Sequence, residues 1–181
     1  NKMNTAVLSS LNLVLMTLVD AYSINGQPPC IQQFVYTAEE NNMHMLAFII
    51  ASLHYPELRD VTACTMFMPL ETALESYVPV SVLNPFYKSI QLREKAIKNL
   101  IVPGVYDLVD KTSLRSINGN TFTVRNKSLV SRANVVNIVE EVDMDTMDSK
   151  VYIVDGLIGI GRDEPAKAIG WTNSIENILF D

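Results

Sequence analysis

The sequence predicts an α+β fold, and its two halves differ in the way that this class requires. Amphipathic helical patterns dominate before Gly104, whereas short strands separated by turn residues follow it. The segment Val151–Ile158 is almost wholly apolar and rich in β-branched residues, which is typical of a central strand buried on both faces, and Asp155-Gly156 predicts a kink within it. Such a strand needs partners, and Val61–Met68 is the one early strand that the pattern predicts.

Length and charge restrict the class of protein. The chain has 181 residues, 48% of them hydrophobic and 19% charged, which suits one globular domain with some extension. The formal net charge is -6, and the 14 Lys and Arg residues are scattered without a basic stripe. We therefore expect neither a nucleic acid nor an anionic membrane surface as the partner.

Residues 1–23 are predicted to be a secretory signal peptide. An apolar run from Ala6 to Val19 is followed by small residues at the cleavage positions, Ala21 and Ser23. The alternatives are an amphipathic core helix, whose polar residues would have to gather on one face, and a membrane anchor, which needs about 20 apolar residues. A cleaved signal predicts a secreted, extracellular protein without a membrane span in the mature chain.

Helical patterns follow a linker over residues 24–30, which contains Gly26 and two prolines. In the clearest of them, Asn42–His54, apolar residues recur near helical spacing, and Pro56 ends the pattern. Pro69 stops the early strand, and Asn84-Pro85 begins a further turn or helix. The predicted helices are Ile31–Ala38, Asn42–His54, Leu70–Tyr77 and Gln91–Leu100.

Short strands with turns between them fill most of the second half. Asn118-Gly119 is a strong hairpin signal, and further turns are expected at Arg125–Lys127 and Arg132–Asn134. Residues 161–181 are expected to form a tail that ends in a helix over Thr172–Phe180. The predicted strands before Val151 are Leu114–Ile117, Thr121–Arg125, Leu129–Val130 and Val135–Val142.

Five segments, in order, resemble the motifs of the fasciclin-domain family over residues 31–160. They are Thr65–Leu74, Lys98–Gly104, Ser116–Val124, Ala133–Val136 and Val151–Ile158. The resemblance implies a fasciclin-like compact β-sandwich wedge with several helices packed along one side. It also implies a non-enzymatic cell-adhesion or matrix-interaction module, whose partner is a cell-surface receptor or a matrix protein.

Of two binding sites known in the family, the sequence retains a candidate for one and lacks the residues of the other. Family members often carry a Tyr-His pair, linked with integrin recognition, where this chain has Asn99 and Leu100, so that route is not supported. A second family site, an Asp followed by an aliphatic residue, corresponds to Asp143-Met144. The exposed carboxylate could complete the coordination of a receptor's metal ion, and the alternative is an acidic loop kept in solvent.

The sequence does not support an enzyme, a cofactor or a metal site of this chain. The acidic run over residues 140–148 fails the EF-hand pattern, because Met147 and Asp148 stand where a ligand and a glycine are required. His44 and His54 would lie on opposite sides of one helix, and neither is beside an identifiable nucleophile.

Three residues invite covalent modification. Cys30 and Cys64 can form one disulfide in a secreted chain, or Cys64 can be a buried free thiol. Asn126 begins a glycosylation sequon at an expected turn.

The alternative function is that of a secreted domain that binds a lipid or another small apolar ligand between its helices and its strands.

Overall fold

The computed structural model describes residues 26–75, 88–142 and 148–168. The predicted signal peptide, Asn84-Pro85, Asp143-Met144 and the helix over Thr172–Phe180 lie outside these residues. Within them helices and strands both occur, with a seven-stranded sheet, so the predicted α+β class is confirmed.

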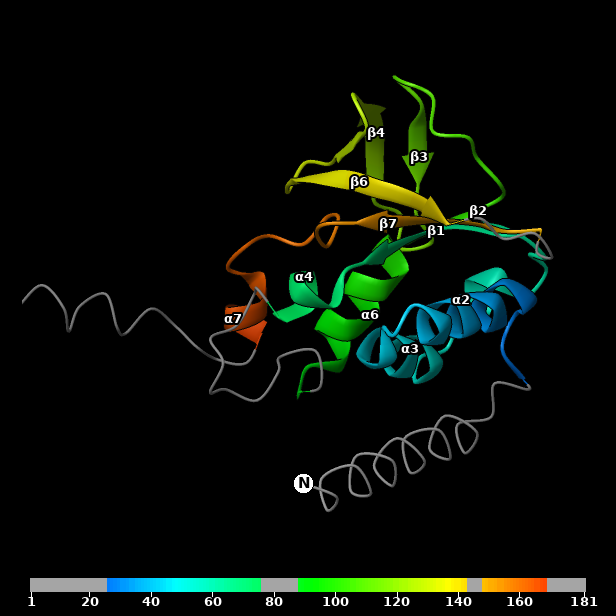
Figure 1. Cartoon of the computed structure of the whole chain (residues 1–181). Helices are drawn as coiled ribbons and strands as arrows, with labels where there is room; N and C mark the ends of the chain where they lie inside the picture. The colour runs from blue at the N-terminus through cyan, green and yellow to red at the C-terminus, as the bar shows by residue number, and fades with distance from the viewer. Residues whose placement is uncertain (1–25, 76–87, 143–147, 169–181) are drawn as a thin grey trace, which may run out of the picture.

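The described helices mostly precede the strands in the chain, as the sequence predicts (Figure 1). The helical elements are α2 (Pro29–Glu40), α3 (His44–Ala51), the 3-10 helix η2 (Pro56–Leu58), α4 (Glu71–Glu75), α6 (Ile90–Asn99) and α7 (Glu164–Ala168). The strands are β1 (Cys64–Pro69), β2 (Ile101–Pro103), β3 (Ser113–Arg115), β4 (Thr121–Arg125), β5 (Ser128–Val130), β6 (Val135–Val142) and β7 (Lys150–Val154).

The sheet has the strand order β2-β1-β7-β6-β5-β4-β3. β1 and β7 form a parallel pair, in register from Thr65 opposite Lys150 to Pro69 opposite Val154. The other neighbouring strands described are antiparallel. The predicted pairing of the early strand with the late apolar strand is therefore confirmed.

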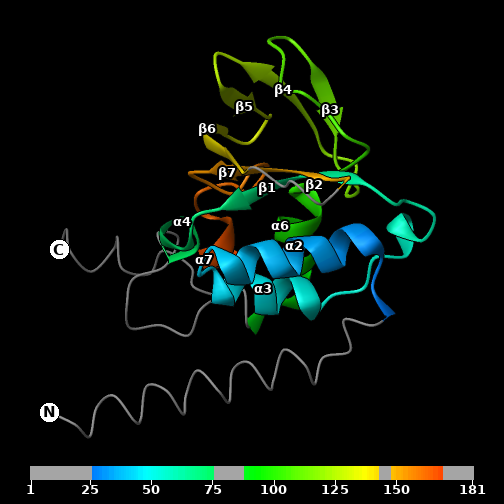
Figure 2. The same cartoon turned by 45° about the vertical axis from the view of Figure 1, so that its right-hand side comes forward.

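The sheet folds over itself, so that its two halves form separate layers. The helices cover one face of β2, β1 and β7, and β3 and β4 lie on the opposite side of these strands (Figures 1 and 2). β6 pairs with strands of both halves, and its ladder with β7 shifts register between Ile138 and Glu140. An irregularity of this kind bends a strand and allows it to take part in both layers.

The middle layer is apolar because it has neighbours on both sides. All six residues of β1 are buried, and so are Val151–Val154 of β7. The Phe67 ring is 5.5 Å from the Phe122 ring in an edge-to-face contact and 5.9 Å from the Tyr152 ring in a stacked one. Because strand side chains alternate, Met66 and Met68 point to the opposite face, toward the helices.

Local sequence explains where the better-defined helices begin. Pro29 occupies the first turn of α2, where a missing N–H costs nothing. The Ser89 hydroxyl caps α6 by accepting from the Leu92 N–H at 3.2 Å. Since α2 starts at Pro29 and Cys30 is fully buried, the predicted linker over residues 24–30 overlaps the first turn of a packed helix.

The predicted bounds are correct for β4 and β6, the predicted strand Val151–Ile158 is too long, and one strand was not predicted. The apolar segment leaves the ladder at Val154 and does not continue to Ile158, because the Asp155 carboxylate accepts from the Asn137 backbone N–H and side-chain amide, each at 2.7 Å. The short strand β2 (Ile101–Pro103) was not predicted. Its three residues carry too little alternation to distinguish them from the end of the preceding helix.

The contact of Phe67 with Phe122 gives a prediction about how the two layers cohere. Replacing each by Leu keeps the core apolar, so each variant should fold with a modest loss of stability. The two losses should be non-additive by about 0.5–1.5 kcal/mol, because either change alone removes the edge-to-face contact. Urea unfolding of the singles and the double measures this. Losses that add within about 0.3 kcal/mol would show that the rings do not interact.

Candidate functional site

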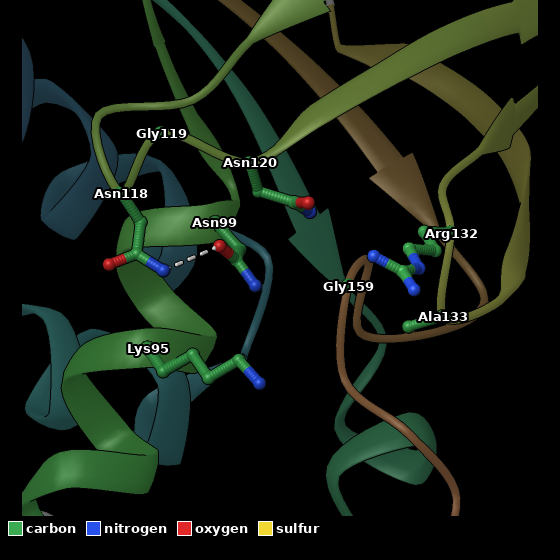
Figure 3. A pocket seen from close by; sticks show the side chains of 8 residues that line it. All are labelled: Lys95, Asn99, Asn118, Gly119, Asn120, Arg132, Ala133 and Gly159. Carbon is green, nitrogen blue, oxygen red and sulfur yellow. Dashed lines mark hydrogen bonds between the residues drawn. The ribbon is translucent and has the colours of Figure 1, made fainter.

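A polar pocket lies where four segments of the chain meet (Figure 3). These segments are the C-terminal half of α6, the turn between β3 and β4, the turn between β5 and β6, and the segment after β7. The pocket has a volume of about 550 Å³. Its lining residues are Lys95, Asn99, Asn118, Gly119, Asn120, Arg132, Ala133 and Gly159.

Asn99 forms the floor of the pocket and connects three of the segments. Its side chain is buried at the end of α6. Its Oδ1 accepts from Asn118 Nδ2 at 2.9 Å, and its Nδ2 donates to the Ile158 carbonyl at 3.2 Å. These bonds hold the hairpin turn and the segment after β7 against the helix, so the floor is preorganised.

Asn120 brings a buried donor that lacks an acceptor among the described residues. Its Nδ2 is buried without a hydrogen-bond partner there. Gly159 passes directly beside it with a φ of 73°, and a Cβ at this position would meet Asn120 Nδ2 at 2.2 Å and Asn99 Nδ2 at 2.7 Å. Only glycine leaves room for this approach, so two amide NH₂ groups converge on one place.

Two cationic side chains extend into the same space (Figure 3). Lys95 forms an ion pair with Glu164 of α7. Arg132 is exposed in the turn before β6 and has no ion pair within the described part of the chain. None of the residues that line the pocket is acidic. The pocket therefore presents hydrogen-bond donors and positive charge, which favours acceptor-rich, anionic groups.

The sequence did not reveal this pocket. Asn118-Gly119 and Arg132–Asn134 were interpreted only as turn signals, and Asn99 only as a departure from a family pattern. Both turns are confirmed, since Gly119 has a φ of 80° and the Ser131 N–H donates to the Asn134 carbonyl at 2.9 Å. The available signal was the concentration of carboxamides in these turns, but their convergence depends on strands distant in the sequence.

A second surface lies at the opposite end of β6 and β7, and we call it the Tyr106 surface. Three of its residues expose large apolar side chains on the segment between β2 and β3: Val105 at 46%, Tyr106 at 39% and Val109 at 64%. Two side-chain hydroxyls hold the backbone of Tyr106: its N–H donates to Thr65 Oγ1 at 2.9 Å, and its carbonyl accepts from the Tyr152 hydroxyl at 3.1 Å. The full set is Val105, Tyr106, Asp107, Val109, Glu141 and Lys150.

Charged side chains border these apolar groups. Lys150 at the start of β7 pairs with Asp107 and, at 3.3 Å, with Glu141. The hydrogen bond with Asp107 raises the pKa of Lys150 above its ordinary value, so the ammonium stays protonated at neutral pH. Asp143-Met144 belongs to the connection that leaves β6 after Val142 and reaches β7 at Lys150.

The remaining predicted residues fall at separate places. Asn126 is exposed in the β4–β5 turn, where it and Lys127 have positive φ values of 47° and 59°, as a tight hairpin requires. The expected turn there is confirmed, and glycosylation stays a prediction. His44 hydrogen-bonds Glu39 at 2.6 Å. Among the described residues, no cluster of His, Cys, Asp or Glu could hold a metal ion, and no helix could cross a membrane.

Cys30 and Cys64 are brought together in the core. Both thiols are free and buried, one at the start of α2 and the other at the start of β1. The Cys64 thiol donates a hydrogen bond to Cys30, which lowers the pKa of Cys30 and raises the pKa of Cys64. The disulfide stays a prediction, and the interaction between the two thiols shows that these side chains are neighbours in the core.

No protein-family model matches the chain, and no curated protein matches it. The resemblance to fasciclin domains therefore rests on the motifs in the sequence.

The cysteine contact predicts a disulfide when the chain is produced in an oxidising compartment. Each thiol loses one proton, and the two electrons pass to a disulfide oxidant such as oxidised glutathione. Thiol titration of the denatured protein should then find no free cysteine, and reduction should lower stability by about 3–4 kcal/mol. Two reactive thiols in the secreted, unreduced protein would contradict the prediction.

Proposed function

We propose that the protein is an extracellular, fasciclin-like binding module that attaches non-covalently to a cell-surface or matrix protein. The observation that carries the proposal is the Tyr106 surface. It combines exposed apolar side chains with a charged cluster that includes Glu141 near the end of β6 and Lys150 at the start of β7. An aromatic anchor next to charged groups is the usual composition of a protein-binding surface.

The arrangement of layers supports the fasciclin-like part of the proposal. The family has a compact β-sandwich wedge with several helices along one side. Here the folded sheet has helices on one face of β2, β1 and β7 (Figure 2). The motif strand β1 is paired with the motif strand β7, and Pro103-Gly104 lies at the end of β2, the strand that follows α6. These features are compatible with the wedge and support it as the finer fold.

The extracellular location rests on residues 1–23 and on two further features. The Cys30–Cys64 contact is suited to an oxidising compartment, and Asn126 is exposed in a tight turn where a glycan would find room. The alternative of an apolar-ligand binder is less well supported, because the pocket described above is lined by amide and cationic groups.

Attachment of cells to the immobilised mature domain tests the proposed surface. We expect Tyr106→Ala combined with Val109→Ser to reduce attachment by about tenfold or more, because the main anchor is lost. The hydrogen bonds that hold Tyr106 are made by its backbone atoms, so this variant should remain folded. Asp143→Ala should also reduce attachment if its carboxylate completes a receptor's metal site.

The matched control is Tyr36→Ala combined with Val135→Ser. These side chains are 55% and 61% exposed on α2 and at the start of β6, away from the Tyr106 surface. The control variant should attach as the unmodified domain does. Equal attachment by all variants would contradict the surface, and unchanged attachment by Asp143→Ala alone would contradict only the carboxylate role.

Secreted expression of the full chain tests the compartment. Cleavage after Ser23 should yield a product that begins at or near Ile24, as measured by N-terminal sequencing of the protein in the medium. Recovery of a cytosolic protein that retains residues 1–23 would contradict the proposed location.

A further inference from the structure

We propose that the polar pocket binds a sugar acid, meaning a small polyhydroxylated molecule that carries a carboxylate. This site is separate from the Tyr106 surface, because the two lie at opposite ends of β6 and β7. The pocket borders Ala133, before β6 begins, and Gly159, after β7 ends. The Tyr106 surface includes Glu141, near the end of β6, and Lys150, where β7 begins.

The first step concerns the hydrogen-bond donors. Asn120 Nδ2 is buried without an acceptor among the described residues, although a buried donor is normally paired. Asn99 Nδ2 uses one hydrogen on the Ile158 carbonyl, which leaves its second hydrogen available. Both groups pack closely against Gly159, where a Cβ would clash with them. An acceptor oxygen that enters from the pocket, which Asn120 lines, would satisfy its unpaired donor.

The second step concerns charge. Arg132 points into the pocket and has no ion pair within the described residues, whereas Lys95 shares its charge with Glu164 (Figure 3). No acidic side chain lines the pocket to repel an anion. A guanidinium matches the planar geometry of a carboxylate and binds it through two parallel hydrogen bonds. We therefore assign the carboxylate to Arg132 and hydroxyl oxygens to the amides.

The third step concerns size and polarity. A volume of about 550 Å³ is too large for a carboxylate alone and lies within the range of small-molecule sites. Carboxamides from Asn118, Asn120 and Asn99 surround the space, and a carboxamide can both donate to and accept from a hydroxyl. A ring that carries several hydroxyls and one carboxylate satisfies volume, polarity and charge together.

Glucuronate, glucose and acetate are the probes that test this inference. They match the whole ligand class, its uncharged body and its carboxylate, respectively. Backbone amide shifts of the folded chain can be followed by NMR during titration to about 10 mM, which suffices for a millimolar Kd. We expect glucuronate to shift signals of Asn99, Asn120 and Gly159 saturably, and to bind about tenfold or more tightly than either control.

Variants separate the pocket from general anion binding. Arg132→Gln and Asn120→Ala should each weaken glucuronate binding by about tenfold or more. Arg125→Gln removes the same charge from an exposed residue at the other end of β4, and it should bind as the unmodified chain does. If Asn120→Ala fails to fold, Arg132→Gln alone decides, because its side chain is exposed.

The outcomes are distinct. Absence of a saturable shift, equal binding of glucose or acetate, or an equal loss in Arg125→Gln would overturn the proposal. Tighter binding of a uronate-terminated disaccharide than of free glucuronate would support it and identify an acidic glycan as the source. Equal binding of the two would support it with the free sugar acid as the source. Failure of cell attachment would not bear on any of these results.

Discussion

Parallel pairing of β1 with β7 is the contact on which the rest of the structure depends. Parallel neighbours require a long crossover, and here that crossover includes α4, α6 and the strands β2 to β6. The pair forms the apolar middle of the molecule, between the helices and the β3–β4 layer. Neither layer could bury its apolar face without it, so the hydrophobic core depends on a contact between distant parts of the chain.

This constraint also determines where ligands can bind. Side chains of β1 and most of β7 are buried, so they are not available to a partner. The polar pocket and the Tyr106 surface both lie where chain segments leave the ends of the strands. At one end three turns and α6 assemble the polar pocket, and at the other the segment between β2 and β3 forms the Tyr106 surface. The same scaffold thus supports two chemically different sites, one polar and cationic, the other partly apolar.

Much of the fold was predictable from the sequence, because its signals are local. β4 and β6 follow from alternation and flanking turns, and their bounds agree with the predicted ones. The end of β7 was not predictable, because it depends on Asp155 reaching Asn137 in a neighbouring strand. The pocket was missed for the same reason: Asn99, Asn120 and Gly159 become neighbours only when the sheet has folded. The predicted site at Asp143-Met144 lies outside the described residues.

Hydrogen exchange followed by NMR tests most directly whether the β1–β7 pair holds the domain together. If it does, backbone amides of Met66–Met68 and Val151–Ile153 should exchange at one common rate, the slowest in the domain, set by global unfolding. Backbone amides of the turns that line the polar pocket, and of the segment that carries Tyr106, should exchange faster, by local opening. Exchange of β1 and β7 at different rates, or faster exchange there than in α2 and α3, would contradict the central role of this pair.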